Sequence, residues 1–169
     1  FTVPGDVVAV STPLYGGVWE LLHEFFVERD EILLVPYSSY ENLREKIEHL
    51  NPGTALSLIY GESPANPTNH LLDVEKICAW ANTLKNRNGR LRTVFDNTFL
   101  GPIFMQPLEH GADMSLYSGT KFLGGHWGCQ MHRACSTLPA PCGWCRCVLF
   151  MVLKVPGYAG YGTFLTKYF

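Results

Sequence analysis

Two hydroxyls and a lysine stand close together in the second half of the sequence. Ser118 and Thr120 are separated by one glycine, Lys121 follows at once, and paired glycines stand at 124–125. Hydroxyls and backbone amides bind phosphate oxygens. A lysine amine beside them acts as a point charge or, when neutral, as a nucleophile toward a carbonyl carbon. The stretch therefore predicts a phosphate-binding corner next to a reactive amine.

The elements that position this stretch are β-rich runs alternating with amphipathic helices. Apolar runs predict strands at 7–10, 32–35 (stopped by Pro36), 55–60, 91–95 and 114–117. Apolar positions three or four residues apart predict helices at 18–26, 41–50 and 73–84, and a short helical segment at 108–110. This alternation is typical of βαβ units. It predicts an α/β fold with three layers, a mostly parallel sheet carrying helices on both faces.

Polar side chains follow three of these strands. Ligands of parallel α/β sheets bind beyond the carboxyl ends of the strands, so these side chains are expected at one edge. They are an amide, a carboxylate, two hydroxyls and an amine: Asn66, Asp96, Ser118, Thr120 and Lys121. An aldehyde cofactor explains this set better than an Asp-His-Ser triad or a carboxylate pair.

Pyridoxal 5′-phosphate would use every member of the set. Lys121, desolvated, is expected to form a Schiff base with its aldehyde, and Asp96 to keep its pyridine nitrogen protonated. Ser118 and Thr120 are expected to bind its phosphate. The protonated ring then accepts electrons from a substrate carbanion.

Tyr15 and Asn66 complete the predicted contacts with the cofactor. Tyr15, on a glycine-rich turn that opens a helix, is expected to lay its ring against the cofactor, and Asn66 to reach the ring hydroxyl. Each residue alone has an ordinary alternative. A strand-end Asp such as Asp96 more often caps a turn, Lys121 is as easily a surface residue, and Glu62 is as easily a strand-end charge. The joint arrangement favours the cofactor.

Four motifs carry a family resemblance, in the order Tyr15-Gly-Gly, ESPANPTN from Glu62, VFDNTFLGP from Val94 and HGADMSLYSGTKFLGGH from His110. They resemble the Cys/Met-metabolism pyridoxal-phosphate enzymes, the family of cystathionine γ-synthase, cystathionine γ-lyase and methionine γ-lyase. The resemblance covers residues 5–126. It implies an incomplete fold type I large domain, similar to that of aspartate aminotransferase, with Lys121 as the Schiff-base lysine and Asp96 as the partner of the pyridine nitrogen. It gives the remaining cofactor contacts to Ser118, Thr120, Tyr15 and Asn66.

The resemblance also implies an activity. It indicates a lyase or transferase of sulfur amino-acid metabolism, of the transsulfuration type, that performs γ-elimination or γ-replacement on a sulfur-containing amino acid. It implies a cytoplasmic homo-oligomer, a tetramer built from dimers. The family's upstream loop, neighbouring-subunit arm and C-terminal domain have no counterpart in this sequence. The alternative expectation is therefore a truncated, catalytically inactive remnant of such an enzyme.

Composition divides the chain at residue 126. All 15 acidic residues precede His126, and five of the six cysteines follow it. We therefore expect a partial cofactor-binding domain at 1–126. The tail, 127–169, is foreign to the family and Pro139, Pro141 and Pro156 are expected to break any regular element in it. An aberrant reading of the gene would explain this abrupt change.

The tail and the charge allow further expectations. Cys142-Gly-Trp-Cys145 has zinc-ligand spacing, but the other gaps between the tail cysteines are irregular, which disfavours a zinc module. The net charge of −2 argues against nucleic acid and an anionic membrane surface as partners. The late apolar run 148–153 is too short to span a bilayer.

Overall fold

The computed structural model describes residues 2–28, 31–51, 53–85, 89–119 and 121, and the backbone of three later strands. The helices and strands follow in the order β1 (Val7–Ser11), α1 (Gly16–Leu21), the π-helix η1 (Leu22–Val27), β2 (Leu33–Tyr37), α2 (Tyr40–Glu48), β3 (Leu56–Glu62), α3 (Val74–Lys85), β4 (Arg92–Asp96), α4 (Gly101–Phe104), β5 (Met114–Ser118), β6 (His132–Ser136), β7 (Cys147–Val152) and β8 (Thr163–Leu165).

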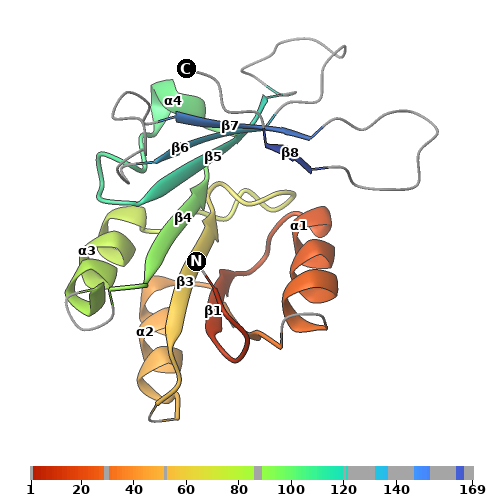
Figure 1. Ribbon diagram of the computed structural model, residues 1–169. Helices are drawn as coiled ribbons and strands as arrows, with labels where there is room; N and C mark the ends of the chain where they lie inside the picture. Colours follow the sequence, from red (N-terminus) through yellow and green to blue (C-terminus); the bar gives the residue numbers. More distant parts are fainter. Residues whose placement is uncertain are drawn as a thin grey trace.

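The strands form one sheet in the order β2-β1-β3-β4-β5-β6-β7-β8. The pairs from β2 to β5 are parallel, and those from β5 to β8 are antiparallel. Helices α2 and α3 lie on one side of the parallel strands and α1 on the other (Figure 1). The predicted α/β fold, a mostly parallel sheet with helices on both faces, is confirmed.

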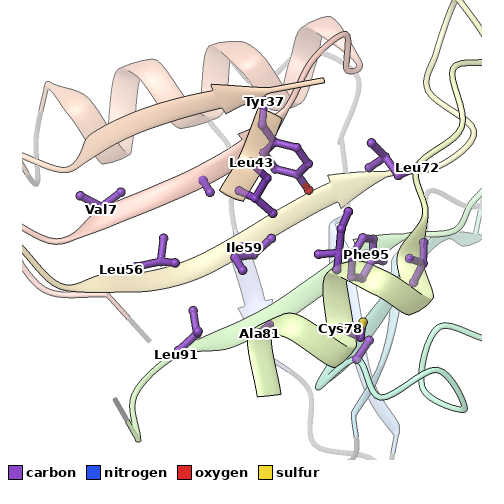
Figure 2. Packing of buried hydrophobic residues seen from close by; sticks show 14 residues of the cluster. Val7, Tyr37, Leu43, Leu56, Ile59, Leu72, Cys78, Ala81, Leu91 and Phe95 are labelled. Carbon is purple, nitrogen blue, oxygen red and sulfur yellow. The ribbon is translucent and has the colours of Figure 1, made fainter. Parts of the chain in front are cut away.

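Each face of the sheet has its own core. The first core packs Leu43 of α2 and Ile77 of α3 against Ile59 and Phe95 of the sheet (Figure 2). The second packs Leu22 against alternate residues of the same strands, Val8, Val10, Leu58, Tyr60 and Val94. Strand β1 is buried along its whole length, so its apolar run needs no polar alternation. The two cores fix β1, β3 and β4, the strands whose ends form the site.

Three local features differ from the sequence-based expectations. Strand β2 runs through Pro36, because β2 is an edge strand in the described sheet and the missing N–H costs no ladder bond there. The predicted helix at 18–26 is divided into α1 and the π-helix η1. The predicted segment at 108–110 is a turn, and the helix stands earlier, at Gly101–Phe104, where Pro102 suits a first turn.

The tail contains regular structure, contrary to the expectation. Strands β6, β7 and β8 add to the edge formed by β5. The expectation was wrong because Pro139, Pro141 and Pro156 lie between these strands and not within them. The proposed division at residue 126 stays a prediction. The side chains of the zinc hypothesis lie outside the described residues; among those described, no three His, Cys, Asp or Glu side chains are grouped to hold a metal ion.

Candidate functional site

The carboxyl ends of β3, β4 and β5 bring the predicted polar residues to one edge. Glu62 is paired in register with Asp96, and Asp96 with Leu116, two residues before Ser118. Because side chains alternate along a strand, Glu62, Asp96 and Ser118 point to the same face of the sheet. We call Tyr15, Glu62, Asn66, Asp96 and Ser118 the cofactor edge.

Glu62 joins two of the predicted cofactor contacts. Its Oε2 accepts the backbone N–H of Tyr15 at 2.8 Å, and its Oε1 accepts the backbone N–H of Asn66 at 2.7 Å. Its own N–H donates to Ser11 Oγ at the end of β1, at 3.0 Å. One carboxyl group thereby holds Tyr15, which is 47 positions from Glu62, and Asn66, which is 4 positions from it.

Thr98 connects two other members of the cofactor edge. Its N–H donates to Asp96 Oδ1 at 2.9 Å, and its Oγ1 accepts the N–H of Ser118 at 2.8 Å. Asn97 N–H donates to Leu116 O at 2.9 Å, which ties the same turn to β5. The turn after β4 thus sets the position of Asp96 relative to the end of β5.

Tyr15 and Asn66 stand at opposite sides of Glu62. Tyr15 is the N-cap of α1, and the residue is 54% exposed. A Cβ atom placed on Gly17 would come within 2.9 Å of Tyr15 Cε1, so the ring lies directly over Gly17. Asn66 is half-buried, in the turn after β3. The open side of the Tyr15 ring is available to a flat ligand.

The predicted lysine differs from expectation in its surroundings. Lys121 lies three residues beyond β5 and is exposed, whereas a desolvated amine was predicted. The described part of the chain supplies no cover for its side chain. Thr120 lies outside the described residues. The structure therefore assembles Tyr15, Asn66, Asp96 and Ser118, and places Lys121 after them in solvent.

The buried acids shape the electrostatics of the edge. Burial is the largest cause that raises the pKa of Glu62, and the nearby Asp96 adds to it, while the N–H groups of Tyr15 and Asn66 oppose it. Burial, with Asp96 and Glu62 nearby, raises the pKa of Tyr60. Burial thus makes the charged form of Glu62 less favourable than in water, and a cation bound nearby would favour it.

Sequence reasoning did not assign two residues that organise the edge. The sequence leaves Glu62 between a strand-end charge and a ligand, and it marks Thr98 only as part of the VFDNTFLGP motif. The available signal was local. Thr98 stands two residues after Asp96, the spacing at which an Asp side chain accepts a backbone N–H in a turn.

Residues 1–132 match a protein family described as Cys/Met metabolism PLP-dependent enzyme, where PLP is pyridoxal 5′-phosphate. The chain belongs to this family. It is 38% identical over 123 residues to L-methionine gamma-lyase of Pseudomonas deceptionensis, covering 73% of this chain and 29% of that protein. It is 35% identical over 126 residues to cystathionine gamma-synthase of Haemophilus influenzae, covering 75% and 32%. The suspected family is thereby confirmed.

Solved structures agree with the family assignment. Cystathionine gamma synthase of Xanthomonas oryzae pv. oryzae, in complex with aminoacrylate and cysteine, superposes with a TM-score of 0.67 at 28% identity. The superposition covers 78% of this chain and 32% of that protein's chain. The metB protein of Corynebacterium glutamicum gives the same TM-score at 27% identity, over 80% and 33%. The chain thus spans about a third of the length of the proteins that it matches.

The chemistry of the cofactor edge fits the family's cofactor. The Asp96 carboxyl, with Glu62 beside it, suits a protonated pyridine nitrogen, and Ser118 offers a hydroxyl on the same face. Met114, Leu116 and Ser118 are half-buried on that face, and Met114 and Leu116 pack against the second core. The exposed Tyr15 ring offers an aromatic surface.

Proposed function

We propose that this chain carries the pyridoxal-phosphate site of a C–S lyase or transferase of sulfur amino-acid metabolism. One observation carries the proposal: in a member of this family, Tyr15, Asn66, Asp96 and Ser118 are brought to one sheet edge. Relatives named for methionine and cystathionine support a sulfur-containing amino acid as substrate. Elimination or replacement at Cγ is the proposed reaction.

Each residue of the chain has a proposed task. Asp96 holds a proton at the pyridine nitrogen, and the Ser118 hydroxyl binds the phosphate together with Thr120. Asn66 orients the ring oxygen. Tyr15 packs its ring against the cofactor, a contact of about 0.5–1.5 kcal/mol beyond its buried area.

Lys121 has two proposed tasks. Its Nζ would hold the cofactor covalently, and the same amine, once replaced there by the substrate's amine, would move protons at the substrate carbons. The bound cofactor supplies an electron sink for the carbanion formed at the substrate's α-carbon. The homo-oligomeric state and the cytoplasmic location remain predictions from the family resemblance. No described helix has the length and apolar character needed to cross a membrane.

Covalent attachment at Lys121 tests the site. Pyridoxal phosphate is added to the chain, the visible absorbance of a lysine adduct is recorded, and borohydride reduction with peptide mapping locates the modified lysine. We expect the adduct on Lys121 and its loss in Lys121→Ala. Lys76→Ala is the control, because Lys76 is an exposed lysine paired with Asp73 on α3. An unchanged adduct in Lys121→Ala would refute the assignment.

The exposure of Lys121 favours one alternative, an inactive remnant that retains the cofactor-binding motifs. Keto-acid release from methionine or cystathionine separates the two. Release by the wild-type chain, lost in Lys121→Ala, supports the enzyme. An adduct on Lys121 without any release supports the remnant.

A further inference from the structure

Glu62 is the only residue of the cofactor edge whose side chain contacts the backbone of two other members among the described contacts. Each oxygen of its carboxyl group accepts one N–H, from Tyr15 at 2.8 Å and from Asn66 at 2.7 Å. Bonds of this kind, from N–H groups to a carboxylate, are shorter and stronger than those between neutral groups. The two turns they hold follow adjacent strands, β1 and β3.

Glu62 itself is rigidly placed. It is 7% exposed, it is the last residue of β3, and it is in register with Asp96 of β4. Its N–H donates to Ser11 Oγ, so β1 also fixes its backbone. Because these strands fix its backbone, Glu62 holds the turns of Tyr15 and Asn66 in a defined position relative to β1, β3 and β4.

We propose that Glu62 is a positioning residue that sets the spacing of Tyr15 and Asn66 on either side of the cofactor ring. The proposal rests on the proposed function, because it assigns the two turns to cofactor contacts. In this proposal Glu62 acts through the two backbone N–H groups that its oxygens accept. Its effect on binding is exerted through Tyr15 and Asn66.

The substitution Glu62→Gln removes one of the two hydrogen bonds with little change in the shape of the side chain. A carboxamide has one acceptor oxygen, and its NH₂ group faces the second N–H donor to donor. Asp6→Asn is the matched control. Asp6 is 3% exposed and uses both oxygens, for Val3 N–H and Arg90, but it precedes β1 at the opposite end of the strand.

The first measurement is amide hydrogen exchange on the full chain without cofactor. We expect slow exchange at Tyr15 and Asn66 in the wild type, and about tenfold faster exchange at one or both in Glu62→Gln, the loss expected for one hydrogen bond to a charged group. Asp6→Asn is expected to leave both amides unchanged. Wild-type exchange at Tyr15 and Asn66 as fast as in an unfolded peptide would overturn the proposal, even where the variant fails to fold.

The second measurement is the dissociation constant of pyridoxal phosphate, at a temperature where each variant is folded. We expect Glu62→Gln to bind about tenfold more weakly and Asp6→Asn to bind like the wild type. A merely structural role predicts equal, small effects for both variants, and this result would reject positioning. If the wild type binds no pyridoxal phosphate, the proposed function fails, and the exchange data still decide whether Glu62 holds the two turns.

Discussion

Gly17 lies beneath the Tyr15 ring, and this contact leads to a prediction at the scale of single residues. In Gly17→Ala the new Cβ would come within 2.9 Å of Tyr15 Cε1, so the ring must turn away. Alanine in a helix is favoured over glycine by about 1 kcal/mol. We expect a higher melting temperature together with about three- to tenfold weaker pyridoxal-phosphate binding, the range of one aromatic contact.

A neighbouring glycine provides the control for this prediction. A Cβ on Gly16 meets no atom within 4 Å. Gly16→Ala is therefore expected to keep wild-type cofactor affinity, as measured by the same titration. Equal affinity in Gly17→Ala and Gly16→Ala would show that the Tyr15 ring does not support the cofactor from its present position.

The roles of residues could be predicted from the sequence where the residues form a motif, and less well where a role depends on contacts with the backbone. Asp96 and Ser118 follow predicted strands, so their placement on one edge was foreseeable. Glu62 was ambiguous, because its partners are N–H groups 47 positions and 4 positions away, and no side-chain pattern marks them. The exposure of Lys121 was not foreseeable either, since it depends on what covers the residue in space.

Gly61 of β3 stands beside Phe95 of β4 on the face that α3 covers, and it yields a prediction at the scale of elements. It is paired in register with Phe95, and a Cβ there would lie 2.6 Å from Phe95 Cε1 and 3.0 Å from Leu72 Cδ1. Phe95 is 1% exposed and lies within the first core (Figure 2). The glycine makes space for the Phe95 ring.

Gly61→Ala is therefore expected to destabilise the fold. Overpacking costs about 1–3 kcal/mol, which exceeds the gain of roughly 0.5–1 kcal/mol from replacing a glycine in a strand. The free energy of unfolding is measured by urea titration. Gly89→Ala is the control, because a Cβ on Gly89 meets nothing within 4 Å. A neutral Gly61→Ala would mean that β3 and β4 pack less tightly than described.

Helices and strands could be predicted where the apolar pattern is long, and less well where their extent depends on a neighbouring element. The five parallel strands and helices α2 and α3 fall close to the predicted ranges, because their apolar positions face the two cores. The end of β2 and the four residues of α4 were missed. Pro36 is tolerated only because β2 pairs on one side, a fact of sheet order that no local pattern contains.

At the scale of the whole molecule, a polar cluster around Asp113 lies at the end of the sheet opposite the cofactor edge. Asp113 Oδ2 accepts Thr93 N–H at 2.7 Å and Thr93 Oγ1–H at 3.0 Å, and it pairs with Lys85 Nζ at 2.6 Å. The cluster joins the end of α3 to β4 and to the chain entering β5. Burial raises the pKa of the adjacent Cys78 thiol to about 12, so this residue adds no charge.

The Lys85–Asp113 pair gives the prediction at this scale. Removing one partner leaves the other charge largely buried, so Lys85→Met is expected to lower the free energy of unfolding by about 3 kcal/mol. Removing both charges, in Lys85→Met with Asp113→Asn, leaves no unpaired charge and is expected to recover part of that loss.

Because the cluster lies away from the cofactor edge, the folded single variant should bind pyridoxal phosphate with wild-type affinity. Denaturant titrations of the two single variants and the double variant measure the coupling. Strictly additive losses would show that the two side chains do not interact in solution, and that packing alone holds α3 against the sheet.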